Sequence, residues 1–201
     1  MRLKRLIVED FLPAPEHAAL LAFALANEAR FHPAEVHARG EGRYAPGMRN
    51  SLRFAGDLGA VGSAFISAIT SSQQQMFAGT GTAPFPVKRC EIELSAHGDG
   101  GFFGLHQDSL TGAERASRSA DRVITAVYWF HVQPKAFSGG QFALYPLTPG
   151  GEPDLIEPRD NRLIAFNAMA PHAVQPVSCP AGTFAASRFS INCWLHRGRD
   201  Q

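Results

Sequence analysis

Two residues with metal-binding side chains, His106 and Asp108, stand two positions apart in the segment GDGGFFGLHQDS (residues 98–109). Side chains on alternate residues of an extended strand leave the same face, so an imidazole and a carboxylate at this spacing point the same way. The glycines allow a tight turn before the pair, and the apolar residues Phe102, Phe103 and Leu105 predict that this strand enters a core. The triplet alone is equally compatible with a solvated surface strand, so a metal site needs a third ligand from elsewhere.

His172, in the segment NAMAPHAVQPV, is the best candidate for that third ligand. Pro171 and Pro176 restrict the backbone around it, and Val174 is expected to share its inward face. Two histidines and one carboxylate on one side of an ion leave coordination positions open, which is the arrangement of a non-haem Fe(II) oxygenase site. Taken alone, His172 is also compatible with a core histidine whose hydrogen bonds are satisfied.

The segment RFSINCWL (residues 188–195) alternates polar and apolar residues, which predicts a strand with two different faces. One face carries Arg188, Ser190, Asn192 and Trp194. That face would either meet water or line the interior of a barrel-like sandwich whose apolar face packs under helices.

Other segments after residue 86 also have strand character, without a repeating βαβ pattern. They are expected at residues 88–96, 122–132, 141–145, 154–157, 162–166 and 172–177, with 122–132 as a central strand because it is apolar on both faces. Two helices are expected earlier, one from Pro15 to about Arg30 and one beginning near Asp57, with Leu58, Val61, Phe65, Ile69 and Met76 on one face.

This order of elements predicts an α+β, mostly β fold: a double-stranded β-helix (jelly roll, cupin-like) with N-terminal helices packed on one sheet. We expect a single domain over residues 1–201, with 1–86 as helical support and lid and 87–196 as the jelly-roll core.

Two polar segments are predicted to be loops. Residues 32–53 contain glycines, prolines and four arginines, and they form either a solvated loop or a lid that offers an arginine or Tyr44 to a substrate carboxylate or phosphate. Residues 110–121 follow Asp108 directly and are predicted to be a second mobile loop.

The composition is that of an ordinary globular protein, with 45% hydrophobic residues, 18% charged residues and a formal net charge of +1. Near-neutral charge predicts neither nucleic acid nor a membrane surface as a partner, and no apolar run approaches the length of a membrane span. The three cysteines are widely separated and indicate neither a disulfide framework nor a thiolate zinc site. We therefore expect a cytoplasmic protein, and its oligomeric state is left open.

Several motifs occur in one order along the chain: ELSAHGDGGFFGLHQDS, RVITAVYWF, SGGQFALYP, NRLIAFN, HAVQPV and RFSINCWLH. Together they resemble the Fe(II)/2-oxoglutarate-dependent dioxygenases, in particular the prolyl 4-hydroxylase-like branch with its bacterial members. The resemblance covers about residues 87–196, and FLPAPEHAALL near the N-terminus resembles bacterial members as well.

The resemblance implies that His106, Asp108 and His172 bind Fe(II) and that Arg188 holds the distal carboxylate of the cosubstrate 2-oxoglutarate. It also implies that Ser190 and Tyr128 donate hydrogen bonds to that carboxylate. O2 would be the second cosubstrate, and a requirement for ascorbate is left open. The implied reaction hydroxylates an aliphatic C–H bond of a peptidyl, prolyl or small-molecule substrate and releases succinate and CO2.

Two other classes of protein remain as alternatives: a cupin-type metalloenzyme that does not use 2-oxoglutarate, and a non-catalytic jelly-roll binding module. The chain has His97 where many relatives carry tyrosine and His131 where asparagine is frequent. Either residue is a local packing exchange, or His97 lines the site as a polar contact.

Overall fold

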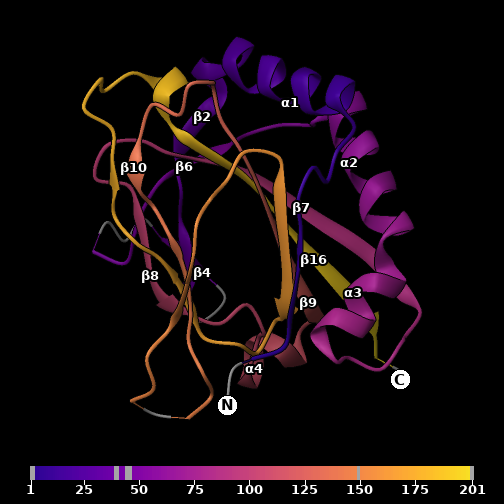
Figure 1. The fold of residues 1–201 in the computed structure, drawn as a ribbon. Coiled ribbons are helices and arrows are strands. Elements are labelled where there is room, and N and C mark those ends of the chain that lie inside the picture. The colour runs from indigo at the N-terminus through magenta and orange to yellow at the C-terminus, as the bar shows by residue number, and fades with distance from the viewer. Residues whose placement is uncertain (1–2, 39–40, 44–46, 149, 200–201) are drawn as a thin grey trace.

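The computed structural model describes residues 3–38, 41–43, 47–148 and 150–199. Two antiparallel sheets face each other, and three helices cover the outer face of the larger sheet (Figure 1). The seven-stranded sheet has the order β1 (Arg5–Val8), β13 (Arg162–Asn167), β9 (Ala120–Phe130), β16 (Arg188–Gly198), β7 (Val87–His97), β6 (Leu52–Phe54) and β2 (Phe31–Pro33). The five-stranded sheet has the order β12 (Asp154–Ile156), β11 (Phe142–Leu144), β14 (His172–Val174), β8 (Phe102–His106) and β5 (Arg49–Asn50).

Smaller elements complete the described chain. Two short ribbons pair β3 (Val36–Ala38) with β4 (Glu41–Arg43) and β10 (Ser138–Gly139) with β15 (Val177–Ser178). The helices are α1 (Ala14–Ala26), α2 (Gly59–Ser71), α3 (Gln73–Thr80) and α4 (Gly112–Ala116), with 3-10 turns at Glu28–Arg30 and Phe184–Ala186.

Strand β16 shows how the sequence pattern becomes a layered core. Its alternate residues Phe189, Ile191, Cys193 and Leu195 are fully buried on the helix side of the large sheet. There they join helix residues such as Leu20, Phe65, Ile69 and Met76 in one hydrophobic cluster. The intervening polar residues of β16 point between the two sheets, so the second alternative for this strand is the correct one.

The predicted fold class is confirmed, and three local predictions are corrected. Residues before 87 contribute strands to both sheets, so the N-terminal part is more than helical support and lid. The segment 110–121 contains α4 in place of a continuous loop. The second predicted helix is broken at Ser72, because serine favours helix ends over helix interiors, and Met76 consequently lies in α3.

The segment 32–53 was predicted to be irregular, but its described residues form five short strands. Arg49 enters the space between the sheets, whereas Arg53 is exposed. Tyr44 and Arg39 lie outside the described residues, so the lid hypothesis remains a prediction.

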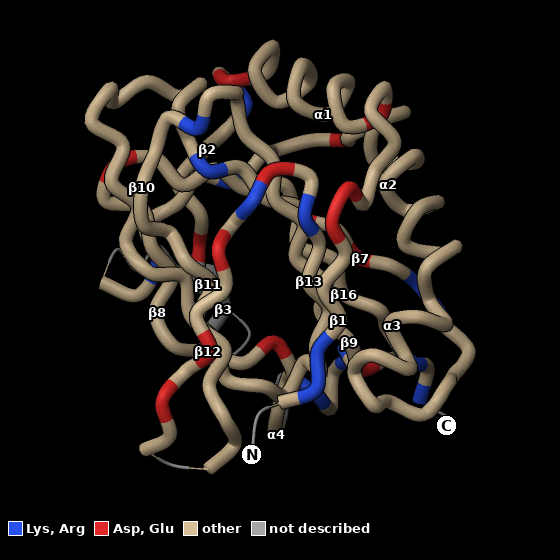
Figure 2. The backbone as a smooth tube through the Cα atoms, in the orientation of Figure 1, with Lys and Arg blue, Asp and Glu red and all other residues tan. Residues whose placement is uncertain are grey.

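Charges of both signs are interspersed along the turns and strand ends seen in Figure 2, as expected for a chain of net charge +1. None of the described helices has both the length and the apolar character required to cross a membrane.

The helix layer should account for much of the stability. Replacing Ile69, which is fully buried, by alanine should lower the free energy of unfolding by about 2–5 kcal/mol, because it leaves a cavity against the sheet. Ile66 lies on the same helix but is only partly buried, so Ile66→Ala is the matched control and should cost distinctly less. Urea denaturation followed by circular dichroism measures both; equal losses would contradict this packing.

Candidate metal centre

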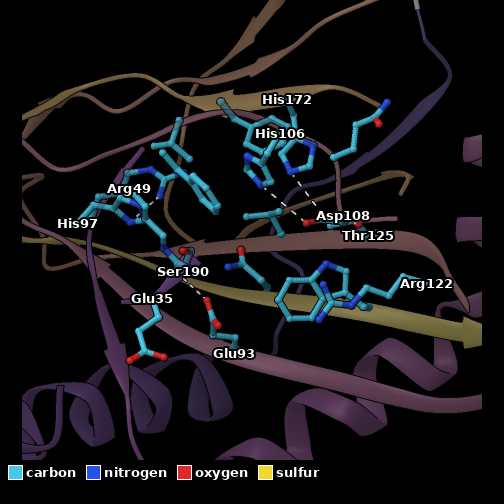
Figure 3. Close-up of a pocket in the computed structure, with 18 of the residues that line it drawn as sticks. Glu35, Arg49, Glu93, His97, His106, Asp108, Arg122, Thr125, His172 and Ser190 are labelled. Carbon is cyan, nitrogen blue, oxygen red and sulfur yellow. Dashed lines mark hydrogen bonds and ion pairs between the residues drawn. The ribbon is translucent and has the colours of Figure 1, made fainter. Parts of the chain in front are cut away.

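Backbone pairing brings the three predicted ligands together from two segments of the chain. His106 on β8 lies directly opposite His172 on β14, and their ring centroids are 4.1 Å apart. Asp108 follows β8, where its backbone N–H donates to the carbonyl of Ala168 at 3.1 Å. One ligating atom from each of the three residues lies within 4.8 Å of the others, and Figure 3 shows both imidazoles directed at Asp108.

A backbone carbonyl two residues earlier in the same segment sets the tautomer of each imidazole. His106 Nδ1 lies 2.8 Å from the carbonyl of Gly104, and His172 Nδ1 lies 2.9 Å from the carbonyl of Ala170. A carbonyl only accepts, so each ring donates from Nδ1 and its neutral form keeps a lone pair on Nε2. Burial, with the neighbouring His172, lowers the pKa of His106 to about 4, so this ring is neutral at pH 7. Both Nε2 atoms face Asp108, at 3.7 and 3.4 Å from its carboxylate oxygens.

Asp108 is held in its ionised form. Burial alone would raise the pKa of its carboxyl group, but the two imidazoles and the hydroxyl of Thr125 outweigh burial and lower the pKa below its ordinary value. Thr125 on β9 donates to Asp108 Oδ2 at 2.7 Å. Two imidazoles and one carboxylate are a donor set that suits Fe(II), so these residues could hold that ion.

A shift of register between β8 and β14 places the ring of Phe103 against that of His106. His172 pairs with His106, but Val174 pairs with Phe103. The chain therefore advances three residues along β8 where it advances two along β14. The extra residue brings Phe103 onto the side of His106, where the two rings stack at 3.7 Å with 14° between their planes. Leu105 is turned outward and is 55% exposed, which corrects the prediction that it enters the core.

Arg49 completes this wall of the pocket. Its guanidinium lies 4.8 Å from the ring centroid of Phe103, on β5, the strand next to β8. It donates to Glu93 at 2.7 Å and to the hydroxyls of Ser51 and Ser95 at 2.7 and 3.1 Å. Arg49 therefore links the two sheets at the pocket edge.

At the end of the pocket away from the metal ligands, a charged group is buried without a counter-ion among the described residues. Arg188 is 1% exposed, and its Nε and Nη2 atoms have no hydrogen-bond partner among the described residues. Burial lowers the pKa of Arg188 to about 9, so the guanidinium is still charged at pH 7. A buried cation is costly unless it is paired, and its free donors therefore predict an anionic ligand.

Two further buried groups next to Arg188 also lack partners. His97 Nδ1 lies 3.5 Å from Arg188 Nη1, while its Nε2 is unpaired, as is Nε1 of Trp129, whose ring centroid is 5.6 Å from the guanidinium carbon. Burial and the nearby Arg188 hold the pKa of His97 well below its ordinary value, so this ring is neutral. Ser190 lines the same pocket. The arrangement fits a carboxylate better than a neutral group.

The structure does not bring Tyr128 to this pocket. Tyr128 lies on the helix side of β9, and its hydroxyl is 2.7 Å from His17 Nδ1 and 2.8 Å from Asn161 Oδ1. Its predicted bond to a cosubstrate carboxylate is therefore incorrect: adjacent strand residues face opposite sides, and it is Trp129 that faces Arg188. His131 is also elsewhere, with its ring against Phe137 and its Nδ1 bonded to the carbonyl of Val132.

Three lining residues, Glu93, Arg122 and Thr125, were not predicted from the sequence, and Arg49 was included only as one of four arginines in a possible lid. The strand 122–132 is apolar on both faces, so its sequence alone does not indicate which alternate set points inward. The register that pairs Thr125 with Trp194 on β16 supplies that information.

Comparisons with known proteins agree on one family. The profile of the 2OG-Fe(II) oxygenase superfamily matches residues 92–196. An uncharacterized PKHD-type hydroxylase of Synechocystis sp. is 39% identical over 122 residues, which are 57% of this chain and 39% of that protein. The chain thus spans about two fifths of the length of that curated relative.

Solved structures share the fold. A prolyl-4-hydroxylase of Pseudomonas putida superposes with a TM-score of 0.69 at 21% identity, covering 98% of this chain and 94% of that one. A Trichoplax adhaerens prolyl hydroxylase, solved with a peptide fragment of the hypoxia inducible factor oxygen degradation domain, gives 0.71 at 20% identity, covering 96% and 83%. At these identities the likeness establishes the fold alone.

The corrected position of Tyr128 can be tested directly. Tyr128→Phe should leave 2-oxoglutarate affinity unchanged and should cost about 1–3 kcal/mol of stability, because His17 and Asn161 lose a buried partner. Calorimetric titration and thermal unfolding measure the two quantities. A large loss of 2-oxoglutarate affinity with unchanged stability would restore the original prediction.

Proposed function

Because the chain belongs to the 2OG-Fe(II) oxygenase superfamily, we propose that it is a hydroxylase that uses Fe(II), 2-oxoglutarate and O2. The reaction inserts one oxygen atom into an aliphatic C–H bond to give an alcohol, and the other enters succinate as 2-oxoglutarate loses CO2. The observation that carries the proposal is that one pocket holds both a His/Asp/His cluster and a buried guanidinium for which the described residues supply no counter-ion.

His106, Asp108 and His172 are the proposed iron ligands. When bound, the iron supplies the redox chemistry that activates O2. The chain's part is to present two Nε2 lone pairs and one ionised carboxylate from one side, with each ligand fixed by a second hydrogen bond.

Arg188 is the proposed anchor of the 2-oxoglutarate carboxylate farther from the metal. Its planar guanidinium has two unpartnered nitrogens, which suits the two oxygens of a carboxylate. If His97 Nδ1 accepts from Arg188, its Nε2 carries the proton and becomes a second donor, beside Trp129 Nε1. The unpaired guanidinium of Arg188 supports the use of 2-oxoglutarate over the alternative of a cupin-type metalloenzyme that does not use this cosubstrate.

The proposed substrate is a peptidyl residue, with proline as one candidate, or a small molecule of similar shape. The peptide complex of the Trichoplax enzyme supports the peptidyl class. Arg122, whose guanidinium carbon lies 3.9 Å from the ring centroid of Trp194, is on the pocket side away from Arg49 and His97 (Figure 3), where a substrate would approach.

Anaerobic addition of 2-oxoglutarate to the Fe(II)-loaded protein tests the proposal. We expect the weak visible charge-transfer band of a keto acid chelated to iron, and we expect His106→Ala to abolish it. Absence of the band in the wild-type protein, or its persistence in His106→Ala, would contradict the proposed Fe(II)/2-oxoglutarate site.

Arg188→Met separates a binding role from a structural one. The substitution removes a buried unpaired charge, so thermal stability without ligand should stay the same or rise by about 1–4 kcal/mol. Affinity for 2-oxoglutarate should fall about 100-fold or more, because the carboxylate loses its buried cation. Arg53→Met, at an exposed site, is the matched control and should change neither quantity. A strong loss of stability in Arg188→Met would indicate a structural role instead.

Thr125 should tune metal affinity through Asp108. Thr125→Val keeps the shape but removes the donor to Asp108 Oδ2, so affinity for Fe(II) or Mn(II) should fall about 10- to 100-fold. Thr125→Ser retains the hydroxyl and should bind metal nearly as the wild type does. Anaerobic calorimetric titration measures all three proteins, and equal affinities would show that this bond does not matter.

A further inference from the structure

A second pocket lies farther along the same face of the large sheet. It has a volume of about 340 Å³ and shares Leu110 and Arg122 with the metal-centre pocket. We call it the outer pocket; it is lined by β7, by the segment after α4 and by the end of β16. The stacked pair Arg122 and Trp194 stands between the two pockets.

The outer pocket is cationic although the whole chain is nearly neutral. Its described lining includes Lys88, Arg89, Arg118 and Arg122, with Glu91 as the carboxylate among them. Glu91 accepts from Arg122 at 2.8 Å, from His196 at 2.8 Å and from Arg89 at 3.2 Å. Burial would raise the pKa of Glu91, but His196 and Arg122 outweigh burial and lower this pKa to about 2, so Glu91 is ionised at pH 7. The carboxylate of Glu91 thus accepts from three side chains, and the described lining of the outer pocket keeps a net positive charge.

The donors that Glu91 does not use are those available to a ligand. No ion pair of Arg118 is found among the described residues, and its side chain is exposed. Within the described part of the chain, the one hydrogen bond found for Lys88 Nζ is to the hydroxyl of Ser119, at 3.5 Å. A carboxylate-sized anion would find the positively charged groups of Arg118 and Lys88 at the exposed rim of the pocket.

The register of the sheet gives the spacing between the two pockets. Thr125, which binds Asp108, pairs with Trp194, and His196 comes two residues later on β16. Two residues of extended chain span about 7 Å. An extended peptide lying along this face, with its target residue at the metal centre, would therefore bring a side chain two or three positions away to the outer pocket.

We infer that the outer pocket binds an acidic side chain of a peptidyl substrate, about two or three residues from the residue that is hydroxylated. The inference rests on the proposed function and narrows it, because it selects peptides with Asp or Glu near the target. The attraction is mainly electrostatic, so high salt should weaken it.

Binding can be tested without turnover. The probes are acetyl-tetraglutamate amide, acetyl-tetraglutamine amide and inorganic phosphate, observed by ligand NMR and by tryptophan fluorescence, since Trp194 contacts Arg122. We expect the tetraglutamate to bind and the tetraglutamine not to. Arg118→Glu should weaken binding roughly fivefold or more. Arg53→Glu makes an equal charge change on β6, opposite Ser95 of β7, and should leave binding nearly unchanged.

The anaerobic 2-oxoglutarate band should be unchanged in Arg118→Glu, which separates failure of this inference from failure of the proposed function. Equal binding of the two peptides, or equal effects of the two variants, would overturn the inference. Binding of phosphate that Arg118→Glu abolishes, without preference for tetraglutamate, would identify a site for free anions and would also overturn it.

Identifying the hydroxylated peptides is a second test of the inference. The iron-loaded protein is given 2-oxoglutarate, O2 and a random peptide pool, and the peptides that gain one oxygen atom are sequenced by mass spectrometry. We expect Asp or Glu to be enriched two or three residues from the modified position, and the enrichment to disappear in Arg118→Glu. Hydroxylated peptides without that enrichment would contradict the inference, whereas a pool left unmodified would contradict the peptidyl part of the proposed function.

Discussion

Antiparallel pairing of β16 with β7 on one side and β9 on the other is the interaction on which the pocket depends. It fixes which alternate side chains of three long strands face the helices and which face the second sheet. A shift of one residue would exchange Arg188 for Phe189 and place a charge against the helices. The fully buried apolar residues of β16 make that exchange costly, so the helix-side core also holds the polar face in register.

The polar face then divides into regions of different chemistry along the strands. Arg188, His97 and Trp129 form an end with unused donors, the His/Asp/His cluster lies in the middle, and the outer pocket lies beyond Trp194. Carboxylates within the face are few and are used internally: Asp108 faces the imidazoles, and Glu93 neutralises Arg49. The remaining cations give the face a preference for anions at both ends.

Much of this could be predicted from the sequence because period-two alternation is a local signal. The resemblance to the 2-oxoglutarate dioxygenases is confirmed by the family match, and the mostly β fold is confirmed by the sheets. The ligand set His106, Asp108 and His172 remains a proposal, although the structure gathers the three residues. Tyr128 was placed wrongly because a strand buried on both faces gives no signal of which side is inward.

The contributions of Arg49 and Thr125 depend on pairing between distant segments, which a single sequence does not reveal. Arg49 lies in a polar stretch that reads as a loop, and only its pairing with β8 brings it over Phe103. The outward turn of Leu105 has the same origin, since it follows from one extra residue in β8 opposite β14. Local composition predicts elements well, but it does not predict irregularities that arise between strands.

The two carbonyl groups that accept from Nδ1 of His106 and His172 belong to residues two positions earlier in the same segment of chain. No side chain elsewhere in the protein is needed to choose the tautomer. Substitutions in the outer pocket or along its rim therefore leave this choice intact. The proposed metal ligands thus do not depend on the outer pocket for their tautomers, so substitutions there could change substrate preference while the histidines keep the same lone pairs available.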